Sequence, residues 1–230
     1  MSNKPEGIST CIIAKNCALA LKDCLDSLLP FLHPDLGDEV IMIDTGYTDG
    51  PPQVAARAGA RVYRHPELNQ RGMLDLVEKH LPQFKERISG SLPLHDGFIA
   101  DFAAARTLAH SYAKNPLHFW LDSDDILVGG SALRQLAADY FMSPDPDHRC
   151  IFLQYDYSFE EDGSPNSVLW RERIIRANQY HWKGTCHESI IPNEGIPANF
   201  EKVPPEIRVI HKHGRHHIFS DVRNFCIMQQ

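Results

Sequence analysis

The stretch His118-Phe-Trp-Leu-Asp-Ser-Asp-Asp-Ile-Leu-Val128 joins a short apolar run directly to three carboxylates. A run of this length is typical of a buried strand, and open α/β sheets bind ligands just beyond the carboxyl ends of their strands. Asp122 and Asp124 are two residues apart, so both can approach one ion, and a divalent cation relieves the repulsion between clustered carboxylates. A solvent-exposed acidic turn is the alternative interpretation of the same residues.

Strands and helices alternate in the part of the chain that precedes this stretch. The predicted strands are residues 8–15, 39–44 and 60–63, and the predicted helices are residues 18–32 and 51–59. The first helix has leucines at helical spacing, and the second has Pro near its start and Gly at its end. This order, with short links, predicts an α/β fold whose parallel strands are joined by right-handed crossovers.

The overall composition is that of a globular protein and limits the function classes. The formal net charge of -7 argues against a generally basic surface for nucleic acid or membrane. No apolar run approaches the length of a membrane span, and the polar start MSNKPEG is not a signal peptide. Six scattered cysteines without a CxxC pair predict reduced thiols, and hence a cytoplasmic protein.

Two common nucleotide-binding motifs are missing after the first predicted strand. A dinucleotide-binding fold would need G-x-G-x-x-G there, and a P-loop would need G-x-x-x-x-G-K-[ST]. The chain has Ala14-Lys-Asn-Cys-Ala18 instead, with no glycine. These residues exclude a Rossmann dehydrogenase and a P-loop NTPase.

An ordered set of motifs resembles the GT-A-fold, family 2 glycosyltransferases. The set consists of residues 8–25, DEVIMIDTGYTDG at 38–50, DFAAAR at 101–106 and WLDSDD at 120–125. The resemblance covers most of residues 7–128 and is weaker from 170 to 224. It implies a GT-A fold with a mostly parallel central sheet flanked by helices.

The resemblance also implies a single domain over residues 1–230. Residues 7–128 would form the nucleotide-binding half, with an insertion at about 64–97 in which residues 74–88 are predicted to form one amphipathic helix. Residues 129–219 would form the half that holds the acceptor and the metal. Residues 220–230 are expected to start a C-terminal helix that is cut short, as in a piece of a longer protein.

The donor-binding residues implied by the resemblance lie at the predicted strand ends. Asp44 and Asp101 would flank base and ribose, although a helix N-cap is the alternative role for an aspartate at such a position. Gly46 would let the backbone approach the ligand closely. The remaining residues expected beside the nucleotide sugar are Ala14, Asn16, Arg106, Asp122 and Ser123. For Arg106, a salt bridge to a nearby carboxylate is the alternative.

Asp122-Ser-Asp124 is similar to the DxD motif of this family. Asp122 would then face the ribose and Asp124 would bind the metal that bridges the diphosphate, whereas Asp125 is expected to be structural. His211, after the last predicted strand, lies where several GT-A enzymes supply a histidine to the metal. An imidazole ligand favours Mn²⁺ over Mg²⁺. His213, His216 and His217 are alternative ligands, and Lys212 and Arg215 could contact the diphosphate.

The catalytic base is expected in the second half of the chain. Tyr180-His-Trp-Lys-Gly-Thr-Cys-His-Glu188 is similar to a Trp…Gly…His-Glu segment of some family members. Inverting transfer needs a base for the acceptor hydroxyl, and Glu188 is predicted to be that base, with Asp156 and Glu160 as alternatives.

The resulting expectation is a metal-dependent inverting glycosyltransferase with a nucleoside-diphosphate sugar donor, most often a UDP-sugar in this family. A sugar nucleotidyltransferase would need a Gly- and Arg/Lys-rich loop after the first strand, and the chain lacks such a loop there. A non-catalytic nucleotide- or glycan-binding module is the other alternative. The acceptor (glycan, protein, lipid or modified nucleic-acid base) and the oligomeric state do not follow from the sequence.

Overall fold

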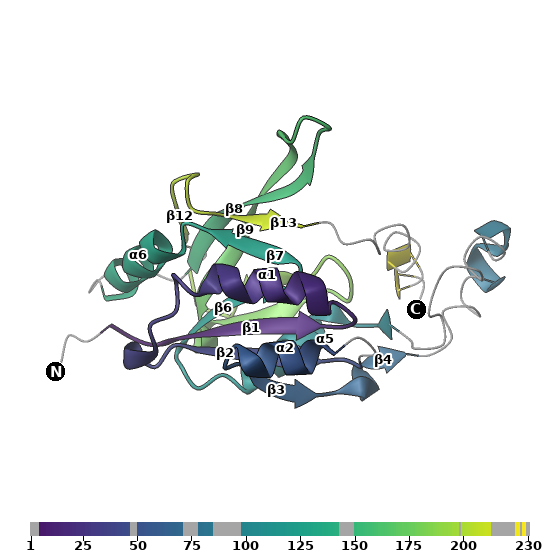
Figure 1. Cartoon of the computed structure of the whole chain (residues 1–230), viewed down its shortest axis with the longest axis horizontal. Helices are drawn as coiled ribbons and strands as arrows, with labels where there is room; N and C mark the ends of the chain where they lie inside the picture. Colours follow the sequence, from purple (N-terminus) through teal and green to yellow (C-terminus); the bar gives the residue numbers. More distant parts are fainter. Residues whose placement is uncertain are drawn as a thin grey trace.

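The computed structural model describes residues 5–46, 50–70, 78–84, 98–142, 150–197, 199–212, 224–225 and 227–228. Helices cover both faces of one large mixed sheet (Figure 1). The strands of this sheet are β1 (Ile8–Ala14), β2 (Glu39–Asp44), β3 (Arg61–Arg64), β6 (Leu117–Asp122), β7 (Asp125–Val128), β8 (Cys150–Phe159), β9 (Pro165–Arg176), β12 (Glu201–Lys202) and β13 (Arg208–His211). The long helices are α1 (Ala18–Leu28), α2 (Pro51–Arg57), α5 (Phe102–Ser111) and α6 (Gly130–Met142).

The strand order is β3-β2-β1-β6-β9-β8-β13-β7, with β12 beside β8. The first four strands are parallel, as the alternation of strands and helices predicted. Strand β9 then joins antiparallel to β6 and β8, while β13 runs parallel to β8 and antiparallel to β7. The expected α/β fold with a central sheet flanked by helices is confirmed.

Alternating residues of β1 separate the core into two layers. Ile8, Ile12 and Ala14 pack in one cluster with buried residues of α1, α2 and α6. Cys11 and Ile13 point to the other face, where they pack with Ala105 and Ala109 of α5. Because both faces of β1 are covered, all seven of its residues are buried, including the polar Ser9 and Thr10.

Two small two-stranded sheets complete the description. β4 (Asn69–Gln70) pairs with β5 (Phe98–Ile99), and β10 (Tyr180–Lys183) pairs with β11 (Ser189–Pro192). Short 3-10 turns occupy Pro34–Leu36, Pro66–Leu68, Pro82–Phe84 and Ala177–Gln179. Trp182 of β10 packs with Trp120 of β6 and Ala103 of α5, so the β10–β11 sheet lies against the α5 face.

The prediction of one continuous helix over 74–88 is wrong for its described part. Residues 78–80 are helical, Leu81 is not, and a separate 3-10 turn follows at Pro82–Phe84. Pro82 lacks an amide proton and its ring clashes with the preceding turn, which breaks the helix there. Residues 71–77 and 85–97 of the expected insertion lie outside the described residues. The expected C-terminal helix is described only at 224–225 and 227–228, which are helical.

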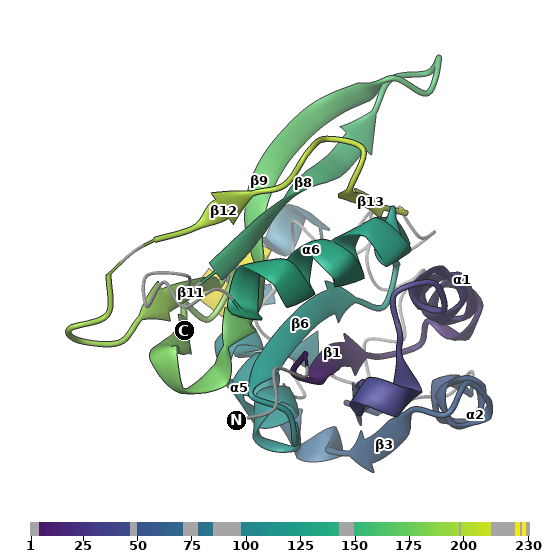
Figure 2. The same cartoon turned by 90° about the vertical axis from the view of Figure 1, so that its left-hand side faces the viewer.

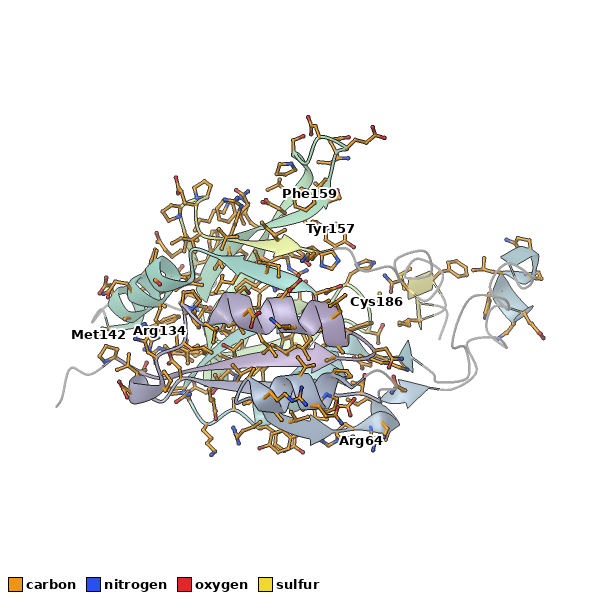
Figure 3. The ribbon with its side chains drawn as sticks, viewed as in Figure 1. Arg64, Arg134, Met142, Tyr157, Phe159 and Cys186 are labelled. Atoms are coloured by element: carbon orange, nitrogen blue, oxygen red, sulfur yellow. The ribbon has the colours of Figure 1, made fainter. Side chains whose placement is uncertain are left out.

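Strands β8 and β9 extend past the sheet as a hairpin arm (Figure 2). Tyr157 and Phe159 lie on this arm (Figure 3), and a turn at 160–164 connects its strands. Within the described part of the chain, no helix is long and apolar enough to cross a membrane.

Candidate functional site

The sheet register brings three strand ends together at one edge. Ala14 of β1 pairs with Asp44 of β2, and Ile13 of β1 pairs with Asp122 of β6. A tight turn at Ser123 and Asp124 leads into β7, whose first residue, Asp125, pairs with His211 of β13. Residues from five strands therefore meet at this edge, which is the ligand-binding position predicted for such a sheet.

Asp124, Asp125 and His211 form a compact cluster whose ligand atoms all lie within 4.8 Å of one another. Nδ1 of His211 is 3.2 Å from Oδ1 of Asp125 and 3.7 Å from Oδ1 of Asp124. Burial alone would lower the pKa of His211, but the hydrogen bond with Asp125 and the nearby carboxylate charges raise it. Two carboxylates and an imidazole are a donor set that suits Mn²⁺.

Asp125 is the anchor of this cluster. Its side chain is fully buried, and each of its oxygens has two contacts. Oδ1 accepts the Tyr155 hydroxyl at 2.9 Å and lies next to His211; Oδ2 accepts the Asp122 amide at 3.1 Å and pairs with Arg173 at 3.1 Å. Both oxygens of Asp125 thus already have protein partners, while the same side chain belongs to the cluster that could hold a metal.

Asp124 is the more open carboxylate. Its side chain is 28% exposed, and the neighbouring His211 approaches it only at 3.7 Å. Burial, together with the charges of Asp122 and Asp125, raises the pKa of Asp124 to about 7, although His211 opposes this. A cation bound here would favour the ionised form, so the residue is suited to be a metal ligand.

Arg106 connects the two halves of the site. Its Nη2 donates to Oδ1 of Asp122 at 2.6 Å, and its Nε donates to Oε1 of Glu188 at 2.5 Å. The guanidinium stacks on Trp120 at 4.2 Å and lies 5.2 Å from the Trp182 ring. Loss of water would raise the pKa of Asp122, but Arg106 and Arg173 outweigh this effect and lower it to about 2. The salt-bridge alternative for Arg106 is the one observed.

Glu188 is linked to Asp122 because both carboxylates accept hydrogen bonds from Arg106. It is 7% exposed, and its backbone oxygen accepts Arg171 at 2.9 Å. Among the described residues, its Oε2 has no hydrogen-bond partner. The preceding residue, His187, has a φ of 57°. This left-handed conformation is uncommon for residues other than glycine, and residues that adopt it are often found at functional sites.

The two alternative bases are less suitable. Asp156 is buried and already pairs with Arg208 at 3.0 Å and with Gln154 at 2.8 Å. Glu160 lies in the tight turn at the tip of the hairpin arm, where its backbone bonds Ser164 and Gly163.

Asp44 lies at the end of β2 and is fully buried. Its Oδ1 accepts the Gly46 amide at 2.8 Å, and Gly46 has a φ of 109° that favours glycine. Oδ2 has no hydrogen-bond partner among the described residues, and Arg64 approaches it at 3.7 Å. Burial raises the pKa of Asp44. Asn16, just beyond Ala14 at the end of β1, has a left-handed φ of 46°.

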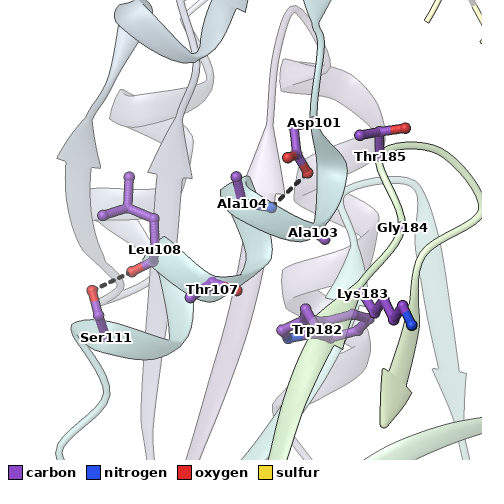
Figure 4. Close-up of a pocket in the computed structure, with 10 residues that line it drawn as sticks. All are labelled: Asp101, Ala103, Ala104, Thr107, Leu108, Ser111, Trp182, Lys183, Gly184 and Thr185. Carbon is purple, nitrogen blue, oxygen red and sulfur yellow. Dashed lines mark hydrogen bonds between the residues drawn. The ribbon is translucent and has the colours of Figure 1, made fainter. Parts of the chain in front are cut away.

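Asp101 caps α5 by accepting the Ala104 amide at 2.8 Å, which is the alternative role expected for it. It also lies at one end of an open groove of about 690 Å³ between α5 and β10 (Figure 4). Trp182 and the loop at Gly184 and Thr185 line the other side of this groove, and Thr185 accepts the Phe102 amide at 2.9 Å. Asp101 does not join the hydrogen-bonded cluster around Asp122.

Lys212 pairs through Nζ with Asp23 of α1 at 2.6 Å, and its amide donates to the Asp124 carbonyl. It therefore ties the end of β13 to α1 and to the β6–β7 turn. His213, Arg215, His216 and His217 lie outside the described residues.

Sequence reasoning missed the residues that support the cluster from β8 and β9. Arg173 is fully buried and stacks on Trp120 at 3.9 Å and on Tyr155 at 4.6 Å, while it holds Asp125. The alternation of β8 places Tyr155 and Tyr157 on one side of the strand. This two-residue alternation can be read from the sequence, but it does not predict which strand will pair with β8.

Comparisons with known proteins agree with this fold. Residues 9–72 match the family model described as glycosyl transferase family 2. A search of curated proteins finds no match to the sequence.

Among solved structures, TarS from S. aureus is similar with a TM-score of 0.52 and 14% identity, over 96% of this chain and 39% of that chain. Mannosyltransferase PcManGT from Pyrobaculum calidifontis, in complex with GDP-Man and Mn²⁺, has a TM-score of 0.44 and 17% identity, over 65% and 35% of the two chains. Glucosyl-3-phosphoglycerate synthase from Mycobacterium tuberculosis, in complex with Mn²⁺, UDP and phosphoglyceric acid, has a TM-score of 0.43 and 17% identity, over 76% and 57%.

The chain thus spans between 35% and 57% of the length of these solved chains. At such low identity the likeness concerns the fold, and the match to TarS extends it over nearly the whole chain. Residues 9–72 are therefore similar to glycosyl transferase family 2, and the chain shares its fold with TarS.

Proposed function

We propose that the chain is a metal-dependent inverting glycosyltransferase that uses a nucleoside-diphosphate sugar, with a UDP-sugar as the first donor to test. The observation that carries this proposal is the pair of adjoining groups at one sheet edge. Asp124, Asp125 and His211 form a cluster that could hold a cation, and Arg106 joins Asp122 to Glu188.

Asp124 and His211 would hold the metal, Mn²⁺ or Mg²⁺. Asp125 would be the weaker third ligand, because its two oxygens already have four protein contacts. When bound, the metal would stabilise the negative charge of the departing diphosphate.

The donor nucleotide would lie over the ends of β1 and β2. Oδ2 of Asp44 is buried without a hydrogen-bond partner among the described residues, so an N–H group of a base can satisfy it. Gly46 adjoins this carboxylate, and Ala14, Asn16 and Ser123 lie at the neighbouring strand ends. Asp122, oriented by Arg106, would contact the ribose.

Glu188 is the proposed base. Arg106 fixes Oε1, which leaves Oε2 to accept the proton of the acceptor hydroxyl. The acceptor oxygen then bonds to the anomeric carbon as the bond from that carbon to the diphosphate breaks, which inverts the configuration. The acceptor could be a glycan, a protein, a lipid or a modified nucleic-acid base.

Asp101 is proposed to act at the edge of the nucleotide site, near the groove beside α5. A cytoplasmic location is proposed from the sequence, because its six cysteines are scattered and form no CxxC pair.

A donor screen tests this function. The wild-type chain and Glu188→Gln are incubated with UDP- and GDP-sugars and Mn²⁺, with and without acceptors, and release of nucleoside diphosphate is measured. We expect release by the wild type with one donor class, and a loss of about 10²-fold or more in Glu188→Gln with donor binding retained. Donor binding without any release would favour a non-catalytic binding module. Release of pyrophosphate in a parallel incubation with UTP or GTP and sugar 1-phosphates would favour a nucleotidyltransferase.

A further inference from the structure

The rings of Tyr155 and Tyr157 pack against the imidazole of His211. The Tyr157 ring stacks on it with a centroid distance of 5.2 Å and an angle of only 5° between the planes. Tyr155 meets the same imidazole at 5.8 Å and 67°. The ring of His211 is therefore in contact with one tyrosine at its face and another at its edge.

Strand pairing produces this arrangement. β13 runs parallel to β8 with Val209 opposite Tyr155 and Ile210 opposite Asp156. One more step along both strands sets His211 beside Tyr157, at the start of the hairpin arm. The stack is thus built into the register between the two strands.

Burial does not account for a tyrosine at position 157. Its side chain is 41% exposed, whereas Tyr155 is buried and donates its hydroxyl to Asp125. A partly exposed ring that lies parallel to the imidazole restricts rotation of the imidazole about its Cβ–Cγ bond. Together with the Asp125 contact, this restriction keeps Nδ1 on the side of Asp124.

We propose that Tyr157 is a positioning residue of the metal site, which holds the imidazole plane of His211 for metal binding. The inference rests on the proposed function, because it presumes that Asp124 and His211 bind a cation. Residues that orient a metal-ligating histidine commonly contribute 10- to 100-fold to metal affinity.

Titration of the full chain with Mn²⁺, followed by calorimetry, tests the proposal without any need for activity. The variants are Tyr157→Ala, which removes the ring, and Tyr157→Phe, which keeps the stack but not the hydroxyl. Leu169→Ala is the matched control, because Leu169 is 43% exposed on the adjoining strand of the arm and pairs with Tyr155 rather than His211. Thermal unfolding of each variant is recorded in parallel.

We expect Tyr157→Ala to bind Mn²⁺ about tenfold or more weakly, with Tyr157→Phe and Leu169→Ala within about twofold of the wild type. The unfolding temperatures of the two alanine variants should be similar, which separates positioning from general stability. Equal Mn²⁺ affinity in the wild type and Tyr157→Ala would overturn this inference and leave the proposed function intact. A wild type that binds no Mn²⁺ would overturn the proposed function, and the inference with it.

Discussion

A single guanidinium, that of Arg106, joins two carboxylates that lie 16 and 82 residues away along the chain. Motif reasoning places Arg106 and Asp122 at one site, because both belong to segments that resemble one family. It does not place Arg106 against Glu188, since that contact depends on how β10 and its loop pack on α5. The sequence therefore predicted the members of the site better than their pairing.

Replacement of Arg106 should affect both stability and ligand binding. Arg106→Ala leaves two partly or fully buried carboxylates without their partner, which typically costs about 3 kcal/mol of unfolding free energy or more. Arg134→Ala is the control. Arg134, which is labelled in Figure 3, makes a similar buried pair with Asp38, just before the start of β2. Chemical denaturation should show a loss in both variants.

Only the Arg106 variant should also weaken nucleotide binding, measured by calorimetry with UDP and Mn²⁺. Arg106→Lys serves if the alanine variant does not fold, because a lysine keeps the charge but cannot form both directed bonds. Nucleotide affinity in the Arg106 variants that equals that of Arg134→Ala would contradict the role given to Arg106.

At the scale of elements, α5 and β6 meet through two histidines. His110 of α5 and His118 of β6 face each other with their Nδ1 atoms 3.1 Å apart. Burial lowers the pKa of His118 from 6.5 to about 4, and burial together with His118 lowers that of His110. Both rings are therefore neutral in the folded chain near pH 7.

This pair predicts a loss of stability in acid. Between pH 6.5 and about 4 the unfolded chain binds a proton at His118 that the folded chain does not. The unfolding free energy therefore decreases as the pH is lowered through this range. The shift of His118 corresponds to roughly 3 kcal/mol over this window. Denaturation of His118→Asn at several pH values should show a flatter dependence, while His33→Asn, at an exposed position, should follow the wild type. An unchanged pH slope in His118→Asn would contradict this prediction.

The predicted elements were correct where local pattern and tertiary burial agree. The strands that end at Ala14, Asp44 and Asp122 follow from their short apolar runs. The expected helix over 74–88 is wrong in its described part because Pro82 interrupts it despite the helical spacing of its apolar residues. The stack of Tyr157 on His211 could not be predicted, because it depends on the register of strands 54 residues apart.

At the scale of the whole molecule, the central sheet brings the residues of the candidate site together. Four parallel strands bring Asp44 and Asp122 to one edge, and the mixed half returns β13 to the same edge so that His211 meets the β6–β7 turn. The central claim is that this edge binds a nucleoside diphosphate through a metal on Asp124 and His211.

Calorimetric titration of UDP and of GDP into the full chain, with and without Mn²⁺, tests this claim most directly. We predict nucleotide binding that requires Mn²⁺ in the wild type, and its loss by tenfold or more in Asp124→Ala and His211→Ala. Asp162→Ala, at the exposed tip of the hairpin arm, should bind as the wild type does. Nucleotide affinity that is the same with and without Mn²⁺, or that survives unchanged in Asp124→Ala, would contradict the account.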